Sequence, residues 1–175
     1  NKTIMHVSSS KGKGAFKVRL RSNDKIQFLM GSGSLTEINE TMIDDATSGG
    51  NWNHFAITVQ SSSQGMTFKS YKNGRQHKTR IGTTTNFNIS RILPSETGLT
   101  LTLASNAGGG AYFTGSIDEF RFWKKARTAE QIYNNWFVPI GGGTNKHNSN
   151  IDLGCYLKFN EGITGNSTID SRVLD

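Results

Sequence analysis

Cysteine, proline and long apolar runs are scarce in this 175-residue sequence. The single cysteine, Cys155, rules out an internal disulfide and a cysteine-based zinc site, because both need partners that the chain lacks. The longest apolar stretches are a few residues, whereas a membrane-spanning helix needs about 18 or more. The sequence is nevertheless 34% hydrophobic, and its 20 glycines follow no collagen period, so it predicts one folded, turn-rich domain.

Acidic residues are sparse in the first half of the chain. Up to Leu93 the sequence has 13 basic and 5 acidic side chains, whereas from Pro94 onward it has 7 basic and 8 acidic ones. Such an excess of positive charge indicates either an anionic partner or a solvated strand face that keeps a sheet soluble. No recognised nucleic-acid motif accompanies the charge, so we expect no specific nucleic-acid binding.

Alternating side chains predict strands through most of the sequence. Between Ala15 and Arg21, one face carries Phe16, Val18 and Leu20 and the other carries Lys17, Arg19 and Arg21. Ile26, Phe28 and Met30 repeat the alternation after a turn, which predicts a hairpin. Further strands are expected around residues 55–60, 66–72, 99–103, 114–123 and 154–160, with a tight turn at Asn73-Gly74. Three aromatic or aliphatic residues of these strands are expected to be buried, namely Phe55, Ile57 and Phe122.

One short helix is expected near Thr128–Trp136, because Thr128 and Gln131 form a capping-box signature before an apolar stripe. Residues 141–150 are rich in glycine and asparagine and are typical of a linker. Many short strands separated by turns predict an all-β fold, an antiparallel β-sandwich or jelly roll.

Three blocks carry a resemblance to a known family: Trp52 to Ala56, Tyr71 to Arg75, and Phe113 to Trp123. In order and spacing they resemble the laminin-G-like jelly roll of the concanavalin A-like lectin/glucanase superfamily, and Ile117-Asp118-Glu119 is the most specific part. The resemblance implies that Asp118 and Glu119 are structural groups that tie the last strand to loop backbone. It also implies that the tryptophans Trp52, Trp123 and Trp136 belong to the core.

The tail departs from the family order. The family opens with a strand of the form aromatic-x-Phe-Asn-Glu-Gly, and here Tyr156 to Gly162 matches it near the C-terminal end. We expect residues 1–140 to form a domain lacking its first strands, residues 141–150 to be a linker, and residues 151–175 to open a following repeat. The alternative is that the tail completes the same sandwich in permuted order. The sequence of the tail also resembles that of repeated domains in large phage virion proteins.

Catalytic patterns are weak. Glycoside hydrolases of this fold carry paired carboxylates on one strand face, but Glu37 and Glu40 are three positions apart and so lie on opposite faces of a strand. No nucleophile motif or metal-binding histidine spacing is present. We therefore expect no enzymatic activity. Calcium stays open as a cofactor, because related sandwiches bind it through loop oxygens, and Asp44 and Asp45 are the candidate ligands.

Ligand binding is the function that these observations favour. Tyr112 follows three glycines and is the aromatic residue best placed in a loop for stacking on a sugar ring. Lys17, Arg19 and Arg21 form a basic face that could meet an acidic polysaccharide. We expect a non-catalytic module that recognises glycans or neighbouring structural proteins, in an extracellular or virion-surface protein. A purely architectural decoration domain is the alternative, and a polysaccharide-cleaving enzyme is the least favoured.

Overall fold

The structure, a computed structural model, describes residues 1–9, 15–32, 35–47, 50–62, 65–82, 99–106, 109–141 and 150–160. These residues form two compact units, an N-terminal unit (Asn1–Thr114) and a C-terminal unit (Gly115–Asp175). The elements in chain order are β1 (Lys2–Ser9), β2 (Ala15–Leu20), β3 (Ile26–Ser32), β4 (Leu35–Ile43), β5 (Phe55–Ser62), β6 (Gly65–Lys72), β7 (Arg75–Gly82), β8 (Leu99–Leu103), β9 (Phe120–Trp123), α1 (Ala129–Asn135) and β10 (Leu153–Leu157). No helix among the described residues is both long and apolar enough to span a membrane.

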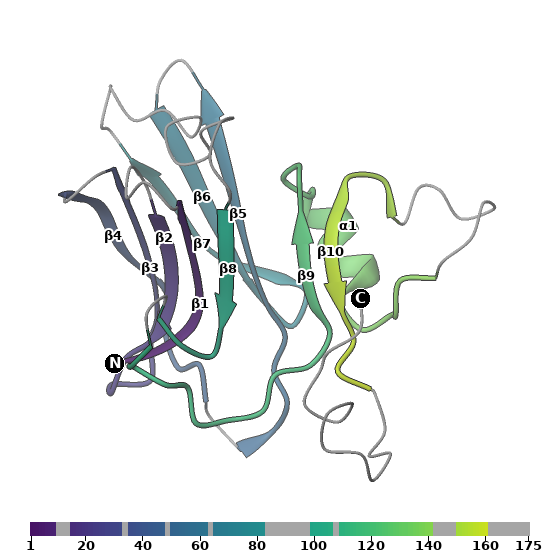
Figure 1. The fold of residues 1–175 in the computed structure, drawn as a ribbon. Coiled ribbons are helices and arrows are strands. Elements are labelled where there is room, and N and C mark those ends of the chain that lie inside the picture. Colours follow the sequence, from purple (N-terminus) through teal and green to yellow (C-terminus); the bar gives the residue numbers. More distant parts are fainter. Residues whose placement is uncertain are drawn as a thin grey trace, which may run out of the picture. The chain divides into compact units, whose positions relative to one another are not determined.

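The N-terminal unit consists of two antiparallel sheets (Figure 1). One sheet has the strand order β4-β3-β2-β1-β8, and the other has the order β5-β6-β7. Their facing side chains form one hydrophobic core, in which Phe28 of β3 packs on Phe68 of β6 with ring centroids 5.4 Å apart. Two sheets that share a core in this way form a sandwich. The predicted antiparallel β-sandwich with one short helix is therefore confirmed.

The alternation in the first hairpin is also confirmed. β2 pairs with β3 from Ala15 opposite Gly31 to Leu20 opposite Ile26. The inward side chains Ile26, Phe28 and Met30 are each 2% exposed, so the apolar positions of the pattern are the core positions. The intervening positions, which hold the basic residues of β2, consequently lie on the outer face of this sheet.

The Asn73-Gly74 turn joins β6 to β7 as expected. Both residues have positive φ, 50° at Asn73 and 77° at Gly74, and these two residue types tolerate that conformation best. The turn is further fixed from outside the hairpin, because the Asn73 amide N–H donates to the carbonyl of His54 at 2.9 Å. The tip of this hairpin is therefore held against the segment that enters β5.

The expectation that Phe55, Ile57 and Phe122 are buried is wrong in degree. Phe55 and Ile57 are half-buried and pack against the margin of the core. The reason is that β5 is an edge strand of its sheet within the described part of the chain. Phe122 is half-buried because β9 belongs to a two-stranded sheet, which covers its side chains incompletely.

The C-terminal unit contains an antiparallel pair of strands and the helix. β10 pairs with β9 from Leu153 opposite Trp123 to Leu157 opposite Phe120, with a bulge at Gly154. A Cβ atom at Gly154 would lie 3.2 Å from the carbonyl oxygen of Phe122, so the close approach of the strands requires glycine here.

The predicted capping box is present and begins the helix. The Thr128 Oγ1 accepts from the Gln131 amide at 3.1 Å, and the Gln131 Oε1 accepts from the Thr128 amide at 3.0 Å. The helix itself is slightly shorter than expected and buries Ile132. The reciprocal bonds satisfy amides that a helix start leaves without partners.

The pairing of β10 with β9 bears on the order of the domain. This pairing is expected if the tail supplies a strand to the same domain as β9. That arrangement was the alternative to a following repeat. Most of the linker, residues 142–149, and the end of the tail, residues 161–175, lie outside the described residues. The domain boundaries therefore stay a prediction.

Candidate functional site

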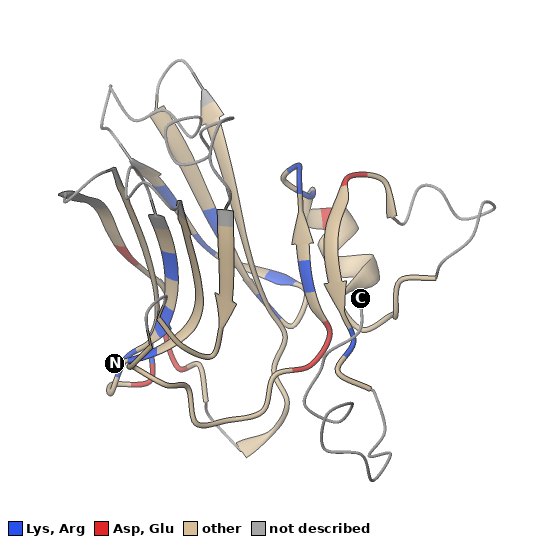
Figure 2. Ribbon diagram, viewed as in Figure 1, with Lys and Arg blue, Asp and Glu red and all other residues tan. Residues whose placement is uncertain are grey.

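A row of polar side chains crosses the outer face of the five-stranded sheet. Residues that pair across strands present their side chains on the same face. In one row His6 of β1 pairs with Lys17 of β2, and Lys17 pairs with Leu29 of β3. In the same sheet Leu29 pairs with Asn39 of β4. The histidine, the lysine and the amide therefore share one surface, and Figure 2 shows the basic residues of β2.

A second row runs parallel to the first. Arg19 of β2 pairs with Thr3 of β1 on one side and with Gln27 of β3 on the other. The Arg19 Nε donates to the Gln27 Oε1 at 2.7 Å, and the Gln27 Nε2 donates to the Asn39 Oδ1. We call His6, Lys17, Arg19, Gln27 and Asn39 the cationic face.

The hydrogen-bond chain fixes the orientation of Arg19. Gln27 is 5% exposed and bonded on both sides, so it is a rigid support for the guanidinium. The two terminal Nη groups of Arg19 donate to no other residue in the part of the chain that the structure describes. They remain available as a fork that matches the two oxygens of a carboxylate or the oxygens of a sulfate.

Lys17 also has no anionic partner among the residues that the structure describes. None of the ion pairs among the described residues involves Lys17 or Arg19, although Lys25, Lys78 and Arg80 all have one. Burial lowers the pKa of Lys17, and the charge of Arg19 lowers it further. Burial and Lys17 likewise lower the pKa of His6. An anion on this face would relieve the repulsion and replace lost hydration.

Tyr112 joins the second row, whereas Arg21 does not. Tyr112 is 65% exposed and forms a parallel bridge with Thr3, the residue that pairs with Arg19. The bridge is anchored by the Thr3 amide, which donates to the Ala111 carbonyl at 2.7 Å. Arg21 lies beyond the paired residues of β2, in the turn closed by its amide and the Lys25 carbonyl at 2.9 Å. The structure thus brings together Tyr112, Lys17 and Arg19 of the predicted ligand-binding residues.

The two acids proposed as calcium ligands lie at the end of β4. The Asp44 carboxylate is 3.1 Å from the Lys25 Nζ, and it also contacts Lys78. Hydrogen bonds from Lys78 and Lys25 lower the pKa of Asp44 to about 2. Asp45 has a φ of 57° and an exposed side chain. Calcium would have to displace the lysines from Asp44.

Nothing in the described residues completes such a calcium site. No cluster of three or more His, Cys, Asp or Glu side chains occurs in the described ranges. The adjacent Ser48 and Gly49 lie outside those ranges. Calcium binding by Asp44 and Asp45 stays a prediction.

In the acidic stretch of β4, Glu40 forms an ion pair with an arginine of the other sheet. The Glu40 carboxylate lies 3.4 Å from the Nε of Arg80 in β7. The side chain of Glu37 falls outside the described residues. Ile38, between the two acids, is 5% exposed and belongs to the core. Glu40 therefore serves as an ion-pair partner between the two sheets.

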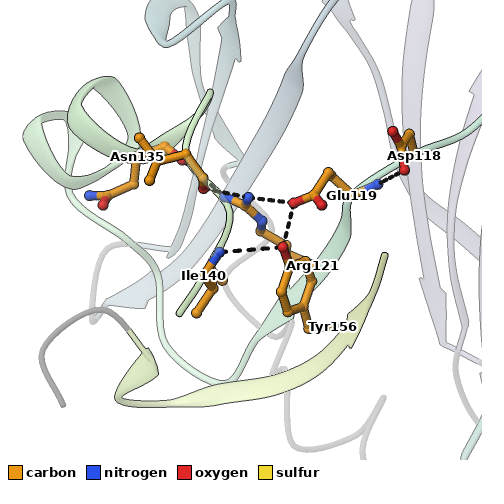
Figure 3. Close-up of polar contacts among 7 residues, drawn as sticks. Asp118, Glu119, Arg121, Asn135, Ile140 and Tyr156 are labelled. Atoms are coloured by element: carbon orange, nitrogen blue, oxygen red, sulfur yellow. Dashed lines mark hydrogen bonds and ion pairs between the residues drawn. The ribbon is translucent and has the colours of Figure 1, made fainter. Parts of the chain in front are cut away.

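A second polar cluster ties the C-terminal unit together (Figure 3). The Glu119 carboxylate accepts from the Tyr156 hydroxyl at 2.5 Å and from the Arg121 Nη2 at 2.7 Å. Arg121 also donates to the carbonyls of Asn135, at 2.9 Å, and Val138, at 2.7 Å. These bonds join both strands to the end of α1 and the segment that follows it.

The Glu119 carboxylate of this cluster is poorly suited to acid catalysis. Burial raises the pKa of Glu119, but the bonds from Tyr156 and Arg121 outweigh it, so that pKa lies below its usual value. The Asp118 Oδ1 accepts from the Glu119 amide at 2.9 Å, where Glu119 has a φ of 53°. A general acid needs a raised pKa, so this geometry fits the structural role that the family pattern implies.

The tryptophans do not all pack as expected. Trp52 is 70% exposed, so its assignment to the core is wrong. Trp123 and Trp136 are half-buried, and the Arg127 guanidinium lies 4.3 Å from the ring centre of Trp123. Periodicity missed Trp52 because it precedes β5 and belongs to no alternating pattern. Its asparagine neighbours were the available signal for a loop position.

Comparison with known proteins places the chain in a family. A solved structure of an S-layer domain-containing protein from Clostridium thermocellum is 22% identical, with a TM-score of 0.38. That match covers 76% of this chain and 61% of the other chain. No curated protein matches. The family described as the Concanavalin A-like lectin/glucanases superfamily matches residues 1–133. The chain therefore belongs to the concanavalin A-like lectin/glucanase superfamily.

Proposed function

We propose that this chain is a non-catalytic binding module that recognises an acidic glycan on the cationic face. The observation that carries the proposal is the pair of neighbouring cations, Lys17 and Arg19, that lack a carboxylate partner among the described residues. Holding two like charges together on a partly desolvated surface is unfavourable without an anion. Binding one would offset that repulsion.

The other groups on this surface suit a sugar better than a peptide or a nucleic acid. Asn39 is exposed on β4 and is linked to Arg19 through Gln27, and its amide group can bond to sugar hydroxyls. Tyr112 lies at the end of the second row, where its exposed ring can stack on the apolar side of a pyranose. A sheet face with charges, amides and one ring matches an extended, negatively charged polysaccharide.

The proposal extends to the place where the module works. Acidic polysaccharides occur on cell surfaces and in capsules, so we place the module in an extracellular or virion-surface protein. Membership of a superfamily that includes lectins supports the binding role. The phage virion origin rests only on the sequence resemblance of the tail and stays part of this proposal.

Heparin binding to the chain of residues 1–175 tests the function. We expect affinity to fall steeply with added salt, as ion-pair binding does. The double variant Lys17→Ala, Arg19→Ala should lose about tenfold or more in affinity, since each lost charge-assisted contact is worth about 1 kcal/mol or more. The matched control Arg75→Ala, Lys124→Ala removes the same charge from exposed positions elsewhere.

Two results would overturn the proposal. Equal losses in both double variants would mean that net charge alone attracts heparin. If neither heparin nor any acidic glycan on an array binds the parent chain at low salt, the architectural alternative replaces the binding role.

A further inference from the structure

The sequence contains a single Asn-Gly dipeptide, Asn73-Gly74, which forms the turn between β6 and β7. Glycine has no Cβ, so its backbone nitrogen is sterically more open to the side-chain amide of the preceding residue than that of any other residue type. Such a nitrogen can attack the amide carbon and expel ammonia, a reaction called deamidation. Asn73 is therefore the asparagine of this chain that is chemically most disposed to deamidation.

The reaction needs only water as a co-reactant. A bond forms between the Gly74 nitrogen, which loses its proton, and the Asn73 Cγ, while the Cγ–Nδ2 bond breaks and the nitrogen leaves as ammonia. Water then opens the five-membered imide ring. Opening at Cγ leaves aspartate, whereas opening at the backbone carbonyl leaves isoaspartate, in which the main chain passes through the side chain and is one carbon longer.

Hydrogen bonds to the segment that enters β5 oppose this attack. The Asn73 Oδ1 accepts from the His54 amide at 2.8 Å, and the Asn73 Nδ2 donates to the Asn53 Oδ1 at 3.1 Å. The Asn73 backbone amide also donates to the His54 carbonyl at 2.9 Å. Both ends of the side-chain amide are thus engaged, and they have to leave their partners before Cγ can turn toward the Gly74 nitrogen.

The turn itself adds to this restraint. Asn73 has a φ of 50° and Gly74 a φ of 77°, so the two residues are held in a tight turn. Gly74 is buried, which limits access of the water that takes up its amide proton and opens the ring. Asn53 is oriented in turn by its Nδ2, which donates to the Asn51 carbonyl at 3.1 Å.

We propose that Asn73 is a deamidation site whose rate is set by its hydrogen bonds to Asn53 and His54. The change is irreversible, because the product has no Nδ2 donor for Asn53, and isoaspartate also lengthens the turn. The new carboxylate follows Lys72 and precedes the exposed Arg75 by two positions, so these cations favour its charge. The structural consequence is therefore the lost bond, which loosens the entry of β5 from the hairpin tip. This inference does not rest on the proposed function.

Peptide mapping by mass spectrometry tests the proposal during incubation of the chain of residues 1–175 in mildly alkaline buffer. Deamidation is measured as the gain in mass of the peptide that contains Asn73, and isoaspartate by enzymatic methylation. The folded chain should react about tenfold or more slowly than the chain unfolded in urea, because the side-chain bonds have to break first. Asn53→Ala removes one of these bonds, so its folded chain should react about fivefold faster than the parent.

Two control variants separate a local effect from a general one. Asn51→Ala changes an asparagine of the same segment but keeps the backbone carbonyl that Asn53 uses, so it should react at the parent rate. Ile26→Val reduces a core side chain of β3, which is 2% exposed, and lowers global stability about as much as the loss of one hydrogen bond does. It leaves the contacts of Asn73 in place and should also react at the parent rate.

The proposal is overturned if Asn53→Ala reacts no faster than Asn51→Ala, or if Ile26→Val is accelerated as much as Asn53→Ala. Equal rates in the folded and the unfolded parent would mean that the turn gives no protection. If another asparagine is modified first in folded Asn53→Ala, the reactive site lies elsewhere.

Discussion

The hydroxyl of Tyr156 donates to the carboxylate of Glu119 at 2.5 Å, and so connects β10 to the residue immediately before β9. Burial raises the pKa of Tyr156, and the bond to Glu119 raises it further, so the phenol stays a donor at neutral pH. The Tyr156 ring also lies under two cations, 5.3 Å from Arg121 and 5.4 Å from Lys158.

Tyr156→Phe removes this hydroxyl and keeps the ring. We expect the C-terminal unit to lose about 1 kcal/mol or more of stability, because Glu119 and the Ile140 amide each lose a partner. Tyr133→Phe is the control, because Tyr133 is 53% exposed on α1. Chemical denaturation, followed by far-ultraviolet circular dichroism, measures the free energy of unfolding of the two variants. Equal stability of both variants would show that the bond contributes nothing.

Acid should weaken the N-terminal unit through Asp44. Its pKa is lowered from 3.8 to about 2 in the folded chain, so the folded state prefers the carboxylate. This stability is fully present above the unfolded pKa and is lost as the pH falls from about 4 toward 2. The carboxylate is 38% exposed, so solvent screening limits the effect to about 1 kcal/mol or less.

Asp44→Asn should therefore flatten the decline in melting temperature between pH 5 and pH 2, roughly the range in which an aspartate titrates. Asp45→Asn, at the neighbouring exposed position, should leave that decline unchanged. An identical pH profile for parent and Asp44→Asn would exclude a stabilising role for the ion pairs with Lys25 and Lys78.

Heparin affinity should rise as the pH is lowered from about 7.5 to 5, across the usual pKa range of histidine. Burial and Lys17 lower the pKa of His6, which keeps the imidazole neutral at pH 7 in the free chain. A bound anion favours the protonated form, so binding takes up a proton and strengthens on acidification. Without ligand, the same lowered pKa means that protonation of His6 on acidification decreases the stability of the folded chain.

His6→Gln should remove most of this rise, whereas His77→Gln, on β7 of the other sheet, should retain it. Isothermal titration in two buffers of different ionisation enthalpy measures the proton uptake directly. Equal pH dependence in parent and His6→Gln would exclude the imidazole from the cationic face.

Core truncation should affect the two units unequally. Phe68 is 0% exposed between the sheets, so Phe68→Ala should cost about 3 to 5 kcal/mol. Phe122 is half-buried on a two-stranded sheet, so Phe122→Ala should cost clearly less. Urea denaturation of both variants tests this, and a larger loss for Phe122→Ala would mean that its ring is covered more fully than the structure shows.

Deletion of residues 144–175 tests the order of the domain. We propose from the β9–β10 pairing that the tail belongs to this unit, so the deletion should cost several kcal/mol through loss of the strand and of the Tyr156 bonds. If the deletion leaves the melting temperature nearly unchanged, the tail instead opens a following repeat, as the sequence pattern favoured.

The alternation of apolar and polar side chains predicted those strands in which the same residues determine both the strand and its packing in the core. In β2 and β3 every second residue is apolar, and burial of Val18, Phe28 and Met30 follows directly from that period. The capping box at Thr128 is equally local, and it begins the helix where expected. Burial in β5 could not be predicted in the same way, because it depends on whether a strand lies at a sheet edge.

The candidate site was only partly visible in the sequence. The period-two pattern placed Lys17 and Arg19 on one face, but the chain from Arg19 through Gln27 to Asn39 needs the register of three strands. The proximity of Tyr112 to that row depends on a bridge to Thr3, more than 100 residues away in sequence. Trp52 was misplaced because an aromatic residue next to a strand is usually buried.

The six residues of β2 alternate between core positions, which stabilise the fold, and outer positions, which form the cationic face. Substitutions at Lys17 or Arg19 change the outer surface and leave the apolar positions of the same strand in place. Ligand preference can therefore be redesigned, for example by replacing both cations with polar or aromatic groups, at little risk to folding. Insertion of one residue within β2 would do the opposite, because it would turn Val18 to solvent and the charged side chains into the core.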